Sequence, residues 1–145
     1  MWVLLGLSVS GFVTMPPTSP EIGLLSVSPW PRVGLASWYS EQDPGIHRAT
    51  ASGERFADDA FTAAMWSIPF DSCVRVTNLK TFEQVTVRVN DRGPHQRLLL
   101  QGRLIDLSRA AFAKLADLDE GLIPVELELL ASPACAGIDS LGPAR

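Results

Sequence analysis

Apolar and polar residues alternate in two stretches of the chain. Residues 85–89 carry valine at every second position, and residues 125–129 carry valine or leucine at every second position. A period of two places the apolar side chains on one face of a β-strand, so both stretches predict half-buried strands. Further β-rich segments predict strands at residues 35–39, 74–79 and 104–105. The polar segment 78–81 predicts the turn between two paired strands.

Helical spacing is found in one segment. Ser108 is a good N-cap, and the alanine-rich residues 109–118 follow it. Their apolar side chains recur every three or four residues, which predicts a helix packed on the core. A shorter helical turn is predicted at residues 62–65. Many short strands with one or two short helices predict a small, mainly β barrel.

The composition changes on both sides of this β-rich region. Residues 1–13 are almost wholly apolar and too short for a typical membrane span, which is typical of a signal peptide, although no Lys or Arg precedes them. Residues 14–32 hold five prolines and predict an extended linker. Residues 131–145 are small and aperiodic and predict a disordered tail. We therefore expect one domain at residues 33–130 of an exported chain.

Composition and charge narrow the class of protein. The chain has 145 residues, of which 46% are apolar, enough to form a core. A net charge of −4 argues against nucleic acid as a partner. Cys73 and Cys135 form no metal-binding motif, and no phosphate-binding glycine loop occurs, so no metal or cofactor is expected. Export would permit a disulfide, but we expect both cysteines to be free, because Cys135 lies in the predicted tail. No lipidation cysteine precedes Cys73.

Six short segments stand out, in this order: 34–39 (GLASWY), 50–56 (TASGERF), 61–70 (FTAAMWSIPF), 74–79 (VRVTNL), 87–94 (VRVNDRGP) and 102–108 (GRLIDLS). Together they resemble motifs of the rare lipoprotein A (RlpA) family. The resemblance covers residues 34–130 and implies a six-stranded double-psi β-barrel with an open sugar-binding groove. One departure is Met65, which stands where the family usually has a histidine. Another is the segment 40–49, in which His47 is one place out of register.

Three carboxylates are candidates for acid/base chemistry on a glycosidic bond. Asp91, at the end of a predicted strand and before the turn Gly93–Pro94, is the first candidate for the catalytic acid and base. Its alternative role is to cap the turn through backbone amides. Glu54 follows Gly53 in a loop; a solvated charge is the alternative, whereas the resemblance implies that it shares the groove. Asp106 is a secondary candidate, and its alternative role is to stabilise the following helix N-terminus.

Five further residues are candidates for substrate binding. Arg92 and Arg103 could hold the lactyl carboxylate of muramic acid or orient Asp91; the alternative is a structural or surface charge. Trp38 and Tyr39 are adjacent on a strand and must point to opposite faces, so we expect Tyr39 in the groove. His95 is a candidate for the groove rim. Packing in the core is the alternative for the aromatic residues.

The resemblance implies a lytic transglycosylase that cleaves MurNAc–GlcNAc bonds in peptidoglycan glycan strands. In such enzymes the C6 hydroxyl of the sugar attacks and a 1,6-anhydro product forms. The implied location is the periplasm or cell envelope, with cell-division or envelope proteins as further candidate partners. The alternative function is an expansin-like module that binds wall glycan without cutting it, or an envelope scaffold. Met65 favours that alternative, because the family histidine is missing.

Overall fold

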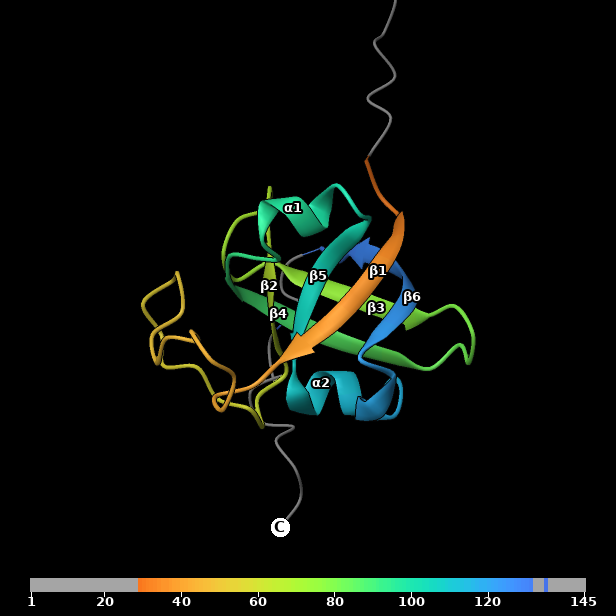
Figure 1. Ribbon diagram of the computed structural model, residues 1–145. Coiled ribbons are helices and arrows are strands. Elements are labelled where there is room, and N and C mark those ends of the chain that lie inside the picture. Colours follow the sequence, from red (N-terminus) through yellow and green to blue (C-terminus); the bar gives the residue numbers. More distant parts are fainter. Residues whose placement is uncertain (1–28, 132–134, 136–145) are drawn as a thin grey trace, which may run out of the picture.

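Six strands, two short α-helices and one 3-10 helix make up the fold. The computed structural model describes residues 29–131 and Cys135 (Figure 1). The elements are β1 (Arg32–Tyr39), β2 (Thr62–Met65), β3 (Cys73–Asn78), β4 (Gln84–Asp91), α1 (Gln96–Leu99), β5 (Arg103–Ser108), α2 (Arg109–Ala113), η1 (Leu118–Glu120) and β6 (Leu122–Leu129). The predicted signal segment, most of the linker and most of the tail lie outside the described residues. The strand predicted at residue 35 begins at Arg32.

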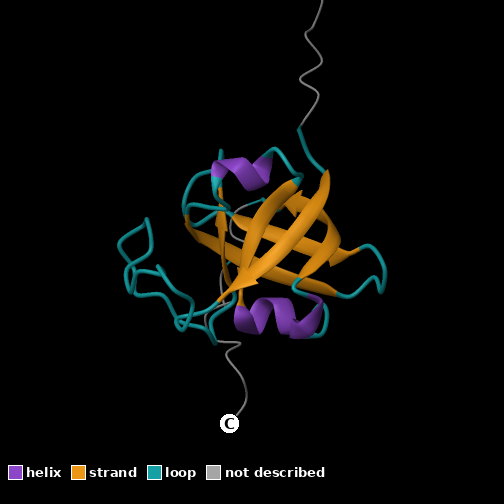
Figure 2. Ribbon diagram, in the orientation of Figure 1, coloured by secondary structure: helices purple, strands orange, loops and turns teal. Residues whose placement is uncertain are grey.

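The strands close into a barrel in the order β1-β5-β2-β4-β3-β6. The pairs β1·β5 and β2·β4 are parallel, and the other four pairs are antiparallel. Helices α1 and α2 lie at opposite ends of the barrel, and the long connection between β1 and β2 extends to one side (Figures 1 and 2). The mainly β, six-stranded barrel predicted from the sequence is confirmed.

The barrel interior is filled by the alternating residues that the sequence pattern identified. Val87 and Val89 on β4, and Val125 and Leu127 on β6, are fully buried in one hydrophobic cluster. Burial of each such side chain contributes roughly 1.5–3 kcal/mol relative to exposure. The β3–β4 turn falls after Asn78, as predicted. The period of two therefore located the core correctly on these strands.

Two helix predictions need correction. Residues 62–65 form strand β2, not a helical turn, because β2 is paired on both sides, with β4 and β5, and all four of its residues are buried. Such pairing outweighs the helix propensity of two alanines. The helix after Ser108 ends at Ala113 instead of Leu118. Its predicted N-cap is confirmed, because the Ser108 side chain accepts a hydrogen bond from the backbone N–H of Ala111.

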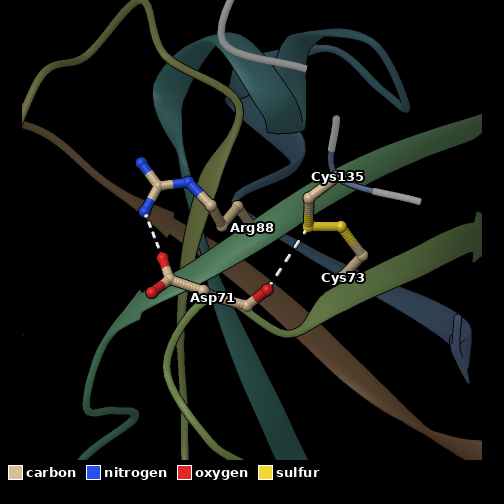
Figure 3. The surroundings of a disulfide bond; sticks show 4 residues. All are labelled: Asp71, Cys73, Arg88 and Cys135. Carbon is tan, nitrogen blue, oxygen red and sulfur yellow. Dashed lines mark hydrogen bonds and ion pairs between the residues drawn. A yellow bond between two sulfur atoms is a disulfide. The ribbon is translucent and has the colours of Figure 1, made fainter. Parts of the chain in front are cut away.

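The expectation that both cysteines are free is wrong, because Cys73 and Cys135 form a disulfide (Figure 3). Their Cα atoms are 5.5 Å apart, a normal distance for such a bond. Cys73 begins β3, and its carbonyl oxygen accepts a hydrogen bond of 2.9 Å from Leu130, just after β6. The chain that leaves β6 therefore passes beside Cys73. Only the β3–β6 pairing, which the sequence does not reveal, brings Cys135 into reach.

Candidate active site

The register of four neighbouring strands aligns two carboxylates on the outer face of the barrel. Ala64 on β2 pairs with Asp91 on β4 and with Asp106 on β5, and Asp106 pairs with Ser37 on β1. Residues paired across adjacent strands point to the same side of a sheet. Two strand spacings separate the backbones of Asp91 and Asp106 by roughly 10 Å. Because Ala64 is small, nothing larger than a methyl group stands between the two acids in this row.

Asp106 is a partly buried carboxyl with a raised pKa. Burial raises the pKa, while the hydrogen bond from the Ser37 hydroxyl and the charge of Arg103 oppose the shift, and the charge of Asp91 adds to it. The Arg103 guanidinium is 3.8 Å from Asp106 Oδ1, and 19% of the Asp106 side chain is exposed. Gly93 lies against the carboxyl, because a Cβ at that position would be 3.3 Å from Asp106 Oδ2. Asp106 is therefore suited to hold a proton yet open to a ligand.

Tyr39 contributes a buried hydroxyl beside both carboxylates. Burial raises the pKa of Tyr39, and the charges of Asp91 and Asp106 raise it further, so the hydroxyl stays protonated. Tyr39 is 9% exposed, and its Oη is buried; the Asp91 carboxylate is within reach as a hydrogen-bond acceptor, which also raises the pKa of Tyr39. Its ring stacks on Phe56 at 4.5 Å between centroids. A buried hydroxyl needs a hydrogen-bond partner, and the neighbouring Asp91 carboxylate supplies one.

Asp91 lies at the end of β4 and holds the loop before β2 in place. Its Oδ1 accepts hydrogen bonds from the backbone N–H groups of Ala51 (2.9 Å) and Arg92 (2.8 Å). The capping role that we left as an alternative is therefore present. Asp91 also lines an open hollow of about 340 Å³ together with residues 45–47, residues 49–51 and Arg92. The carboxylate thus both positions the loop and faces solvent-filled space.

Glu54 belongs to a charged cluster on the loop beside β4. Its carboxylate oxygens accept hydrogen bonds from the Arg88 guanidinium at 2.8 and 3.0 Å and from the Asn90 amide at 2.9 Å. Arg88 also binds Asp71 at 2.9 Å, next to the disulfide (Figure 3). The hydrogen bonds from Arg88 and then Asn90 lower the pKa of Glu54, which therefore stays ionised. This arrangement suits an anchor for residues 50–54 better than a proton donor.

The remaining predicted site residues are dispersed. Trp38 points to the opposite face, as expected from strand alternation, and donates its indole N–H to the Leu118 carbonyl oxygen at 3.1 Å. The Arg92 guanidinium lies 3.7 Å from the centre of the Phe70 ring and donates to the Met65 carbonyl oxygen at 3.0 Å. His95 caps α1. Trp38 and His95 are therefore not gathered with Asp91, Asp106 and Tyr39, whereas Arg92 lines the hollow beside Asp91 but turns its guanidinium toward Phe70 and the Met65 carbonyl oxygen.

Met65 lies in the hydrophobic cluster of the barrel and is 1% exposed. The side chain at the position of the family histidine therefore packs in the core of this protein.

Sequence reasoning missed Ser37 and Gly93. Ser37 is two residues before Tyr39 on one strand, so alternation alone places both on the same face. The close approach of Gly93 to Asp106 had no local signal, because it joins two segments far apart in the chain. Within the described part of the chain, no cluster of His, Cys, Asp and Glu could hold a metal ion. No helix among those residues is long and apolar enough to cross a membrane.

A closed six-stranded barrel with this strand order is the double-psi β-barrel that the resemblance implied. Residues 32–127 match the family described as lytic transglycolase. The chain belongs to that family.

Relatives of known sequence support the same assignment. Over 97 residues the chain is 47% identical to a probable endolytic peptidoglycan transglycosylase RlpA from Nostoc sp., covering 67% of this chain and 25% of that protein. It is 43% identical over 98 residues to the endolytic peptidoglycan transglycosylase RlpA of Campylobacter jejuni, covering 67% and 33%. The chain thus spans a quarter to a third of these relatives, and the resemblance to the RlpA family is confirmed.

Among solved structures, the chain is similar to a mutant of the Clavibacter michiganensis expansin in complex with cellohexaose. The TM-score is 0.52 and the identity is 26%, over 70% of this chain and 50% of that chain.

Proposed function

We propose that this chain is a peptidoglycan lytic transglycosylase, which cleaves MurNAc–GlcNAc bonds in glycan strands and forms a 1,6-anhydro product. The observation that carries this proposal is the row of two carboxyls, Asp91 and Asp106, beside the buried hydroxyl of Tyr39. The names of the relatives support the substrate class. Because the chain is much shorter than those relatives, the activity of this piece alone is what needs testing.

We propose Asp106 rather than Asp91, our first candidate from the sequence, as the proton donor. A general acid must carry its proton when the substrate binds, and burial raises the pKa of Asp106 in that direction. In the proposed reaction Asp106 gives its proton to the leaving glycosidic oxygen as the C1–O bond breaks. The carboxylate of Asp91, on the same face, stabilises the positive charge that develops at the sugar ring.

The second half of the reaction needs a base rather than a water molecule. Asp106, now ionised, accepts the proton of the C6 hydroxyl while the C6 oxygen bonds to C1, and the enzyme returns to its starting protonation state. The Tyr39 hydroxyl, which stays neutral, lies beside these acids and is placed to hydrogen-bond the Asp91 carboxylate. Glu54 acts as a positioning residue, because it ties the loop that donates the Ala51 N–H to Asp91.

The test is mass spectrometry of soluble products after incubation of the full chain with purified peptidoglycan. The full chain is needed because truncation at Leu130 would remove Cys135. We expect anhydro-muropeptides from the wild type, none from Asp106→Asn, and at least a hundredfold less from Asp91→Asn. An Asp106→Asn variant with full activity would refute our choice of acid.

The alternative function is glycan binding without cleavage, favoured by the similarity to an expansin solved with cellohexaose. Retention of the wild-type chain on insoluble wall material, with no soluble anhydro product, would establish it. The missing family histidine at Met65 supports this alternative less than we expected from the sequence, because the side chain at that position is buried in the core.

We also propose that the protein is exported to the cell envelope. The disulfide supports this location, because such bonds persist mainly in oxidising compartments. Peptidoglycan is then the partner that the protein would meet there.

A further inference from the structure

A second hollow lies next to the one that Asp91 lines. It measures about 130 Å³, and Arg48 and Arg55 lie in its wall with Glu41 and Phe56. Ile46 and His47 line both hollows, so the two are neighbours along the loop. A ligand that extends from Asp91 past Ile46 and His47 would meet the two arginines. A chain-like ligand such as a glycan strand is long enough to do so.

The two arginines differ from the other arginines near the site in that their guanidinium groups have no partner within residues 29–131 and Cys135. Arg88 binds Glu54 and Asp71, Arg92 lies on Phe70, and Arg103 faces Asp106. By contrast, the guanidinium groups in the second hollow make no hydrogen bond or ion pair with any other residue that the structure describes. Exposed arginines are common on protein surfaces, but here two that have no partner in the described part of the chain share a hollow next to the candidate active site.

The backbone fixes these two residues relative to each other. Ala49 and Arg55 form an antiparallel β-bridge, and the Phe56 N–H donates to the Arg48 carbonyl oxygen at 2.9 Å. Phe56 is 2% exposed and stacks on Tyr39, so this short ladder is attached to the site. Glu41 brings one negative charge to the same wall, and two guanidiniums outweigh it.

We infer that Arg48 and Arg55 form a subsite for a carboxylate of the bound glycan. Guanidinium groups bind carboxylates through paired N–H donors, which gives this residue type both affinity and orientation. The lactyl group of muramic acid supplies such a carboxylate where no stem peptide is attached, and the stem peptide supplies others where it is. The role that the sequence assigned to Arg92 and Arg103 thus passes to two arginines with free donors. This inference rests on the proposed substrate class.

The test compares binding of three defined saccharides in the Asp106→Asn background, so that no ligand is consumed. They are a chitin oligosaccharide without carboxylates, a GlcNAc–MurNAc oligosaccharide without peptides, and the same oligosaccharide with stem peptides. We expect Arg48→Gln/Arg55→Gln to raise the Kd for at least one carboxylate-bearing saccharide about tenfold, which equals about 1.4 kcal/mol. Binding of the chitin oligosaccharide stays within twofold. The saccharide that loses affinity identifies the source of the carboxylate.

The control variant Arg75→Gln/Lys80→Gln removes the same two positive charges from β3 and the β3–β4 turn, on the other side of the barrel from the loop (Figure 1). It separates local binding from long-range attraction, and we expect it to bind all three saccharides like the parent. Unchanged affinity of Arg48→Gln/Arg55→Gln for both carboxylate-bearing saccharides overturns the inference. An equal loss for chitin, or an equal loss in the control, also overturns it. Release of anhydro products is measured separately on the wild type. If the protein binds the saccharides but releases no product, only the proposed function is contradicted.

Discussion

Removal of the disulfide should destabilise the domain by an amount that follows from the chain it closes. Cys73 and Cys135 are 62 residues apart in the sequence, so the bond encloses most of the barrel. A crosslink over about 60 residues restricts the unfolded chain by about 4 kcal/mol in the chain-entropy description. The variant Cys73→Ala/Cys135→Ala should therefore lose about that free energy of unfolding.

Urea unfolding at fixed pH measures the difference. With a slope of roughly 1–2 kcal/mol/M for a domain of this size, the midpoint should fall by roughly 2–4 M. The reduced wild type is the matched comparison, because it lacks the crosslink but keeps both sulfur atoms. It should unfold close to the double variant, with a small further loss in the variant from the sulfur removed at Cys73, which is 4% exposed.

The entropic account also predicts what should not change. A crosslink that acts on the unfolded chain leaves the native geometry alone, so binding of wall glycan at 25 °C should match the wild type. A difference in unfolding free energy below about 1 kcal/mol would refute the reasoning. Weaker glycan binding in the folded variant would show instead that the disulfide orders Asp71 and, through Arg88, the loop that carries Glu54 (Figure 3).

Three further predictions concern the outer face of the barrel. Gly93→Ala places a Cβ 3.0 Å from that of Ala64 and should lower the free energy of unfolding, measured in urea, by about 1–3 kcal/mol. Adding Ala64→Gly to the same chain should recover part of this loss, and strictly additive effects of the two substitutions would contradict the contact. Asp106→Asn should be at least as stable as the wild type at pH 7 and should lose that advantage toward pH 3. The pKa of Asp106 is raised in the folded protein, so its ionisation opposes folding, and this penalty grows as the pH rises from the unfolded-state pKa through the folded-state pKa. A variant less stable than the wild type at pH 7 would contradict this sign. Glu54→Gln should lower the free energy of unfolding by up to about 1 kcal/mol at neutral pH. The pKa of Glu54 is lowered in the folded state, so the difference should fade as acid protonates the carboxylate of the wild type. A difference that persists in acid would mean that the ion pair with Arg88 is not its source.

Local patterns in the sequence located most strands but not their arrangement. A period of two reports which side chains of one strand share a face, and it was correct for β4 and for Val125 and Leu127 on β6, whereas Leu129 at the end of β6 is exposed. It failed for β2, whose four residues are buried together because strands pair on both sides of it. Nothing local to residues 62–65 reports that they lie in the middle of a closed sheet.

In the candidate site, too, the local sequence identified residues but not their arrangement in space. The motifs identified Asp91, Asp106 and Tyr39 as candidate site residues, yet only the strand order β1-β5-β2-β4 makes them neighbours. The sequence also could not rank the acids, because burial of Asp106 and the ion pair of Glu54 with Arg88 both depend on contacts between distant segments. Those contacts, not the residue types, separate a proton donor from an anchor.

The outer face combines features that oppose folding, which is itself an argument for binding. The charges of Asp91 and Asp106 raise the pKa of the buried Tyr39, and the charge of Asp91 also raises the pKa of Asp106. Ionisation of the partly buried Asp106 therefore carries a penalty. Replacement of Asp106 by an apolar residue of similar shape would remove this penalty, and the core and the disulfide would remain. A bound glycan offers an oxygen that would take the proton of Asp106, so the same features that weaken the free protein would stabilise its complex.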